Sequence, residues 1–238
     1  MHLSIAFHDL AALQERCEVS GVRITRAEPE YENGAVVPAG PWQPISEALA
    51  THLRATDQTS DSCLVEMVKL RHTDTTEMLA ELADPLGDPD ATYLGQAASP
   101  AKALTTTDNY RDGRRIGLHV DNWDKLRYAE KHQGRRRLCL NLGPGARYIL
   151  LGDIDIQAIC RTVHDDYEHR YPHTDDLRTY VARHKPLRCF RIRLAPGEGY
   201  IAPTELLPHD GSTEDQPEPS TAAFWLGHWP RSVLPSLI

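Results

Sequence analysis

The chain has 238 residues and carries 26 Lys and Arg against 34 Asp and Glu, which gives a formal charge of −8 with histidine neutral. This acidic balance argues against general binding of nucleic acids or anionic membranes, because both present phosphate charge. No apolar run approaches the roughly 18 residues that a membrane-spanning helix needs. The length suffices to bury a substantial core, and we expect a single domain over residues 1–238.

The N-terminus and the cysteines bear on the compartment. Residues 1–8 contain neither a basic region nor a long apolar region, so we expect no signal peptide. The five cysteines are odd in number and form no Cys-x-x-Cys pair, which argues against a disulfide framework or a zinc ribbon. The sequence therefore predicts a cytoplasmic protein.

For the first 90 residues, the sequence predicts mostly helices and loops that support the β core, together with one strand. In chain order, the pattern predicts a partly helical segment at 1–28, a Pro- and Gly-rich loop at 29–45, an amphipathic helix at 45–55, a strand at 62–71 and a short helix at 75–83.

Residues 91–238 predict a β core. Short strand-like runs alternate with Gly, Pro and Asp turns, which is typical of a sandwich or barrel. We expect a helical insert near 154–185 and a mobile, exposed acidic loop at 211–220. The predicted strands are 116–121, 137–142, 148–151, 190–194, 200–203 and 222–226. The predicted fold class is mainly β with supporting helices.

One of the predicted strands carries an arrangement typical of a metal site. Side chains alternate between the two faces of a strand, so His119 and Asp121 share one face with Gly117. An imidazole and a carboxylate two residues apart can bind one metal ion, and Gly117 would leave room beside them. The alternative is a structural hydrogen bond between His119 and Asp121.

The tripeptide alone is weak evidence, because about one His-x-Asp match is expected by chance in a chain of this composition. The same pattern occurs at 72–74, where Asp74 is a candidate helix cap, and at 173–175 in the charged insert. His164, His169 and His173 resemble a metal cluster by spacing, but a solvent-exposed helix end is the favoured interpretation there. Only the pair at 119 and 121 lies in a run of alternating apolar residues.

A third ligand would complete the two-histidine, one-carboxylate set that holds non-haem Fe(II) and leaves coordination positions open. His209 is the favoured candidate, because it follows a Pro-Gly turn and an apolar run and precedes Gly211. His228, which stands beside Trp229, is the alternative.

These residues, in short strands with a Pro-Gly turn before the distal histidine, resemble the Fe(II)/2-oxoglutarate-dependent dioxygenases. The resemblance covers residues 108–230, and the segment 108–113 resembles small actinobacterial members that hydroxylate amino acids or natural-product intermediates. It implies a double-stranded β-helix, a distorted jelly roll of the cupin-like kind. It also implies Fe(II) bound by His119, Asp121 and His209, with 2-oxoglutarate and O₂ as cosubstrates.

The reaction implied by the resemblance is hydroxylation, desaturation or cyclisation of a small, amino-acid-like substrate, with succinate and CO₂ as coproducts. Asp121 favours these outcomes over halogenation, because the halogenases of the family lack that carboxylate. Two alternatives stay open: a cupin-type metal-dependent isomerase or lyase, and a non-enzymatic ligand-binding jelly roll.

The chain departs from the family pattern at the cation that binds 2-oxoglutarate. Members usually carry an Arg or Lys shortly after the distal histidine, whereas no Arg or Lys follows His209 before Arg231. A strand at 137–142 would place Arg137 and Asn141 on one face, and a guanidinium suits bidentate binding of a carboxylate. We therefore expect Arg137, with Asn141, to bind 2-oxoglutarate, and Arg231 is the next candidate. The alternative for Arg137 is the end of an exposed basic run.

Overall fold

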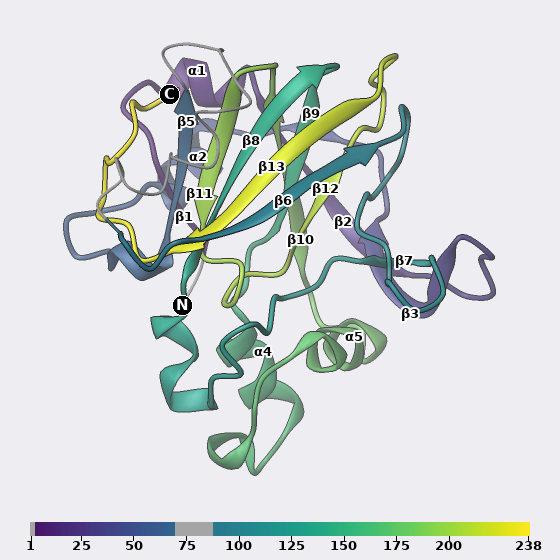
Figure 1. Cartoon of the computed structure of the whole chain (residues 1–238). Helices are drawn as coiled ribbons and strands as arrows, with labels where there is room; N and C mark the ends of the chain where they lie inside the picture. Colours follow the sequence, from purple (N-terminus) through teal and green to yellow (C-terminus); the bar gives the residue numbers. More distant parts are fainter. Residues whose placement is uncertain (1–2, 70–87) are drawn as a thin grey trace.

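The computed structural model describes residues 3–69 and 88–238, and the fold is mainly β (Figure 1). One sheet has the strand order β1-β5-β11-β8-β13-β6, and the other β12-β9-β10-β2-β3-β7, with β4 paired to β2. Successive strands from β8 onward change repeatedly between the sheets, an arrangement compatible with a β-sandwich or jelly roll. No helix among the described residues is long and apolar enough to cross a membrane.

The strands of the first sheet are β1 (Ser4–Ala6), β5 (Leu64–Lys69), β6 (Thr92–Ser99), β8 (Arg136–Pro144), β11 (Glu198–Ala202) and β13 (Ser220–Gly227). Those of the second are β2 (Cys17–Ile24), β3 (Tyr31–Pro38), β4 (Gln43–Pro44), β7 (Arg115–Gly117), β9 (Arg147–Gly152), β10 (Arg188–Leu194) and β12 (His209–Ser212). The α-helices are α1 (Leu10–Gln14), α2 (Glu47–Leu53), α4 (Ile156–Val163) and α5 (Thr174–Ala182).

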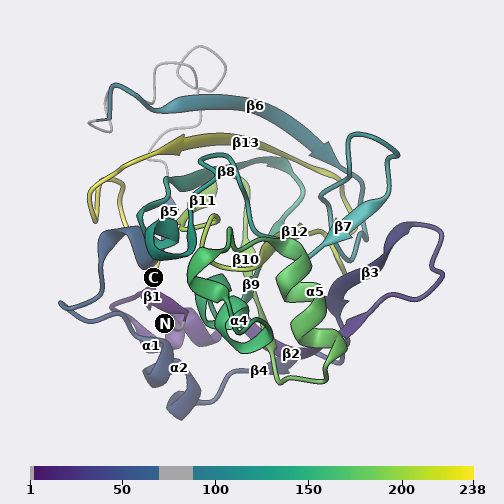
Figure 2. The same cartoon turned by 90° about the horizontal axis from the view of Figure 1, so that it is seen from below.

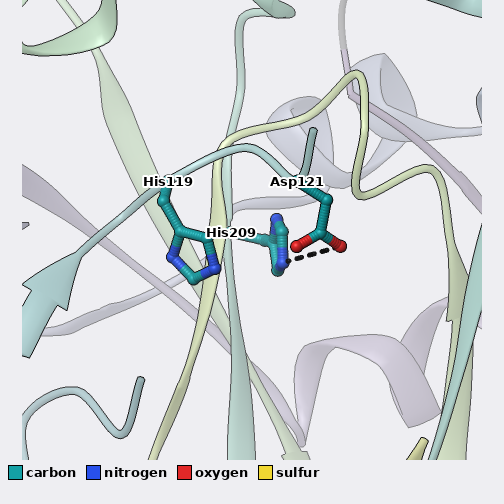
Figure 3. A group of neighbouring side chains, drawn as sticks. All are labelled: His119, Asp121 and His209. Carbon is teal, nitrogen blue, oxygen red and sulfur yellow. Dashed lines mark ion pairs between the residues drawn. The ribbon is translucent and has the colours of Figure 1, made fainter. Parts of the chain in front are cut away.

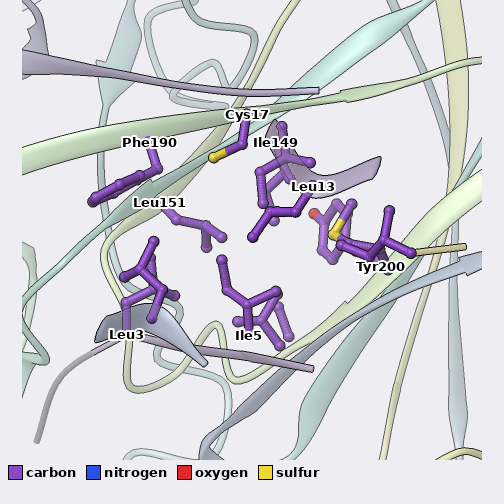
Figure 4. Packing of buried hydrophobic residues seen from close by; sticks show 14 of the residues in the cluster. Leu3, Ile5, Leu13, Cys17, Ile149, Leu151, Phe190 and Tyr200 are labelled. Atoms are coloured by element: carbon purple, nitrogen blue, oxygen red, sulfur yellow. The ribbon is translucent and has the colours of Figure 1, made fainter. Parts of the chain in front are cut away.

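The main apolar core lies between the two sheets (Figure 4). Alternating residues of β9 and β10, including Ile149, Leu151 and Phe190, meet inward residues of the first sheet such as Met67 and Tyr200. Their burial removes apolar surface from water, at roughly 25 cal/mol per Å², and so holds the sheets together.

A second apolar cluster forms where α4 and α5 pack against the second sheet (Figure 2). Leu150 points into this cluster, so strand β9 is buried on both faces. Asp155 caps α4 by accepting from the backbone N–H of Ala158 at 2.8 Å. His173 caps α5 by accepting from the backbone N–H of Asp175 at 3.2 Å, which gives this histidine a structural role.

Several predicted elements are present in the structure. A helix capped by Asp9 occurs within 1–28, α2 lies within 45–55, β5 lies within 62–71, and the insert at 154–185 is helical. Each of the predicted β-core segments contains a strand, although the one at 116–121 ends early. The helix predicted at 75–83 falls outside the described residues.

Other predictions are wrong. Residues 17–24 form strand β2, and the predicted loop at 29–45 contains β3, which pairs with β2 as a hairpin. Gly34 adopts φ +83 inside β3, where its N–H donates to the Thr25 carbonyl at 3.1 Å, so a glycine that indicated a loop instead lies in a paired strand. Strand β6, at 92–99, was not predicted at all.

The acidic segment at 211–220 is the predicted exposed loop only in part: Asp215 and residues 217–219 are exposed, whereas other residues are buried. Its start belongs to β12, and Thr213 is fully buried with its hydroxyl donating to the Pro100 carbonyl at 2.6 Å. Gln216 donates to the Tyr148 hydroxyl at 2.9 Å. Side-chain hydrogen bonds therefore anchor the segment, and its acidic composition did not reveal them.

Candidate metal centre and adjoining cavity

The chain turns at Gly117, and this turn brings His119 to His209. Gly117 has φ +70, and a Cβ there would lie 2.4 Å from the Val36 carbonyl oxygen. Strand β7 ends at this residue. Beyond it, the backbone N–H of His119 donates to the His209 carbonyl at 3.0 Å, and the His119 carbonyl accepts from the His209 N–H at 2.8 Å. The expectation that Gly117 leaves space beside the metal ligands is therefore wrong, because its missing side chain makes room for Val36.

His119, Asp121 and His209 converge as predicted (Figure 3). One ligand atom from each lies within 4.8 Å of the others, and all three residues are buried. Such a group could hold a metal ion, because one ion at about 2.0–2.2 Å from each donor can draw the three atoms together. The paired backbones fix the two histidines, and Asp121 follows two residues after the first.

The hydrogen bonds of the two imidazoles leave the metal-binding nitrogens available. Nδ1 of His119 lies 2.9 Å from the Gly117 carbonyl, and Nδ1 of His209 lies 3.2 Å from the Leu207 carbonyl. A carbonyl can only accept, so each Nδ1 carries the proton and each Nε2 keeps a lone pair. The buried Nε2 of His209 makes no hydrogen bond with any described residue, so its lone pair is free to bind a metal ion.

The charge states also suit a cation. Burial lowers the pKa of His209 to about 3, so this imidazole is neutral at physiological pH. Burial opposes ionisation of Asp121, but the positive charge of Arg137 and the neighbouring imidazoles outweigh it and lower the pKa of this carboxyl. The site thus presents the neutral imidazole of His209 and the anionic carboxylate of Asp121 beside His119.

Arg137 lies beside the metal ligands. Its Nη2 is 2.7 Å from Asp121 Oδ2, although no N–H of the guanidinium is directed at that oxygen. Arg137 Nε likewise makes no hydrogen bond within the described part of the chain. The predicted cation is therefore in the site, where it compensates the charge of Asp121.

A cavity of about 330 Å³ adjoins the ligands. Its lining includes His209, Arg137, Arg147 and Tyr200, and is completed by Tyr148, Gly211, Phe224 and residues 97–99 and 106–108. This volume lies near the lower end of the roughly 300–1,000 Å³ that small-molecule sites occupy.

Arg147 is a site residue that the sequence interpretation missed. It is 4% exposed, its Nη1 makes no hydrogen bond with the described residues, and its Nη2 is 3.5 Å from the Thr106 hydroxyl. A Cβ on Gly211 would lie 2.5 Å from that Nη2, so the missing side chain of Gly211 makes room for the guanidinium. A buried cation with free donors is poised to bind an anion from the cavity.

One signal in the sequence could have indicated Arg147. It starts strand β9 and shares an alternating face with Ile149 and Leu151, which point into the core. An arginine on the inward face of a strand requires a partner, and a ligand is one possibility.

Three other candidates do not join the site. Asn141 bonds the carbonyls of Gly145 and Leu194 at 3.0 and 3.1 Å, so it holds the end of β8 and does not line the cavity. Arg231 pairs with Asp61 at 3.0 Å and also lies outside the cavity lining. His228 is exposed and outside the ligand group. The expectations that Asn141 and Arg231 face the cofactor pocket are therefore wrong.

The histidines of the insert do not form a metal group in the part of the chain that the structure describes. His164 Nε2 lies 2.7 Å from Asp176 Oδ1 between α4 and α5, and His173 caps α5. His173 lies at an exposed helix start, as the favoured interpretation predicts, whereas His164 is half-buried and paired with Asp176, which differs from the predicted solvent-exposed helix end.

Comparison with known proteins adds no assignment to this geometry. A scan against models of protein families finds no match, and a search of curated proteins finds no similar sequence.

Proposed function

We propose that the protein is an Fe(II)- and 2-oxoglutarate-dependent oxygenase that acts on a small, amino-acid-like substrate, and that its two sheets form a double-stranded β-helix. One observation carries the proposal. His209, one member of the buried His–Asp–His group, lines the same small cavity as Arg147, a buried arginine with free donors.

The donor set fits iron. Two imidazole nitrogens and one carboxylate, with further positions open, are the facial set of non-haem Fe(II) oxygenases. Bound iron with 2-oxoglutarate would supply the activation of O₂ for hydroxylation, desaturation or cyclisation, and 2-oxoglutarate would leave as succinate and CO₂.

The chain's own residues would bind and orient the reactants. His119, Asp121 and His209 hold the ion, and the Nδ1 bonds to the carbonyls of residues 117 and 207 fix both rings. Arg147 is the residue we assign to the carboxylate of 2-oxoglutarate remote from the metal, in place of Arg137, the first candidate from the sequence, and of Arg231, the next. Arg137 keeps Asp121 ionised and adds positive charge to the end of the cavity nearest the ligands.

The charge around the cavity differs from the net charge of the chain, and this difference is compatible with binding of an anion. The net charge is −8, yet two guanidiniums face a cavity that would receive a dianion. Because Arg147 is 4% exposed and the Arg137 side chain 14%, their attraction for carboxylates is screened less than it would be at the surface.

Succinate formation from 2-oxoglutarate tests the proposal, with or without an added amino acid. We expect succinate to require Fe(II) and O₂, and to disappear in His119→Ala. His228→Ala is the matched control, because that histidine is exposed and outside the ligand group. Turnover that persists in His119→Ala, or that proceeds without O₂, would contradict the proposal and favour a cupin-type isomerase or lyase.

A further inference from the structure

Asp121 lies beyond the end of a strand, so something other than the sheet must hold it. Strand β7 stops at Gly117, and the paired backbone of His119 and His209 is the last ladder contact of this segment. The backbone N–H of Asp121 donates to the Thr204 carbonyl at 2.9 Å. Its carbonyl oxygen accepts from a different kind of partner, a buried ammonium.

That ammonium belongs to a buried ion pair. Lys131 Nζ lies 2.6 Å from Glu205 Oε2, and the side chains are 0% and 1% exposed. The same Nζ donates to the Asp121 carbonyl and to Asn122 Oδ1, each at 3.3 Å. The other oxygen of Glu205 accepts from the backbone N–H of Asp124 at 3.1 Å. The pair therefore contacts the chain from Asp121 to Asp124.

We propose that Lys131 and Glu205 are positioning residues that hold the main chain of the ligand Asp121, so that its carboxylate faces His119 and His209. This inference rests on the metal centre of the proposed function. Neither residue touches the ion, so their contribution would pass through the backbone of Asp121.

The energetics favour a positioning role over a simple contribution to stability. Burying two charges costs several kcal/mol per ion, and a buried pair is often no more stabilising than apolar residues of similar volume. This pair also needs space, because a Cβ on Gly134 would lie 2.7 Å from Glu205 Cβ. What the pair adds beyond packing is a donor at the Asp121 carbonyl and an acceptor at Asp124.

A second buried pair in the same molecule provides a matched control. Glu66 Oε2 lies 2.6 Å from Arg136 Nη2, and Glu66 Oε1 accepts from the backbone N–H of Ser232 at 2.7 Å. Glu66 thus repeats the bonding of Glu205, one oxygen to a cation and one to a backbone N–H. Arg136 otherwise bonds the carbonyls of Leu64 and Trp229, and neither Glu66 nor Arg136 lines the site cavity.

The experiment measures Co²⁺ affinity by calorimetry and the visible spectrum of bound Co²⁺, together with thermal unfolding. Glu205→Gln should weaken Co²⁺ binding about 10-fold and change the spectrum, in line with the 10–100-fold effects of residues that support metal ligands. Glu66→Gln should lower the unfolding temperature comparably but leave affinity within about 2-fold, because its partners do not contact a ligand.

A double variant guards against loss of folding. Lys131→Met/Glu205→Met replaces the pair with apolar side chains and should stay folded. It should still bind Co²⁺ about 10-fold more weakly, because the Asp121 carbonyl has lost its donor.

The outcomes separate the two proposals. Wild-type affinity and spectrum in folded Glu205→Gln and in the double variant would overturn the positioning role while leaving the metal centre intact. Equal losses of affinity in Glu205→Gln and Glu66→Gln would overturn it as well, since the effect would then be general. A wild-type protein that binds no Co²⁺ would refute the metal centre itself, and the positioning role with it.

Discussion

The space between the two sheets has two ends that are built by the same strands and differ in chemistry. On β9, Ile149 and Leu151 point into the apolar core, whereas Arg147 on the same face lines the cavity. On β8, Cys139 belongs to the core and Arg137 to the cavity. Tyr200 belongs to both and stands at the boundary.

The comparison indicates what each end contributes. The apolar end is closely packed and supplies stability through buried surface. The cavity end keeps polar atoms without hydrogen-bond partners among the described residues, on Arg137, Arg147 and His209, and such atoms are costly to bury. Under the proposed function, a metal ion and the carboxylate of 2-oxoglutarate would supply the missing partners of these atoms.

The largest expected effect separates the two ends through stability. Ile192 is fully buried in the apolar core. Ile192→Ala should reduce the free energy of unfolding by about 3 kcal/mol, because it leaves a cavity that the neighbours fill only in part. Chemical denaturation measures this loss. Affinity of the folded variant for 2-oxoglutarate should stay at the wild-type value, and a large drop would show that the two ends are coupled.

Next in size is the effect of removing the unpaired cation. Arg147→Met should weaken 2-oxoglutarate binding to the Co²⁺-loaded protein about 10- to 100-fold, the value of charge-assisted hydrogen bonds of about 1.5–3 kcal/mol. Calorimetry measures the affinity. The metal-free variant should be at least as stable as wild type, since a buried donor without a partner is removed.

Arg231→Met is the matched control for that substitution. This arginine pairs with Asp61 outside the cavity, so affinity for 2-oxoglutarate should not change. Unchanged affinity in Arg147→Met would show that another residue binds the carboxylate, and a loss in Arg231→Met would reverse the assignment.

A third effect concerns pH. Burial lowers the pKa of His209 to about 3 from an ordinary value of 6.5. Between these values the unfolded chain binds a proton that the folded chain does not, so stability falls as the pH falls below 6.5. The metal-free protein should lose about 2 kcal/mol between pH 7 and pH 5 from this residue.

His209→Gln should remove this contribution to the pH dependence of stability, because glutamine does not titrate. Denaturation of the metal-free wild type and variant at the two pH values gives the comparison. Parallel pH dependence in both proteins would mean that His209 is not held neutral by burial.

The smallest expected effect comes from the space beside Arg147. Gly211→Ala would place a methyl group against Arg147 Nη2 and the Thr106 hydroxyl, at 2.5 and 2.4 Å in the present geometry. We expect the guanidinium to shift and 2-oxoglutarate affinity to fall about 10-fold, or about 1.4 kcal/mol. Gly21→Ala, which meets nothing within 4 Å, is the control. Equal affinities for 2-oxoglutarate in the two variants would show that the Arg147 guanidinium can shift away from the added methyl group without losing its contact with the ligand.

The sequence predicted the His–Asp–His group better than the proposed anion site. His119 and Asp121 lie in a run of alternating apolar residues, and His209 follows a Pro-Gly turn and an apolar run, so local patterns sufficed for all three. Arg147 stands in an equally regular strand, but its role depends on Gly211 and Thr106 from distant segments. No local sequence pattern indicates that these distant residues come together. The strand spacing instead favoured Arg137.

The strands at the N-terminal side were missed for a different reason. Strand β3 begins beside glutamate, asparagine and Gly34, residues that favour loops when read locally. Its pairing with β2 decides its conformation, and such pairing is tertiary information that overrides propensity. The expected jelly roll is correspondingly supported only as a mainly β, two-sheet arrangement.

If the protein binds a metal as proposed, the reciprocal backbone bonds between His119 and His209 also bear on when it could acquire the ion during synthesis. The second histidine belongs to β12, the penultimate strand, which pairs with β9. A nascent chain that has not yet exposed β12 therefore has only two of the three donors. Capture of the ion should come late, after most of the sandwich has formed, and the metal would then act as a reporter of completed folding.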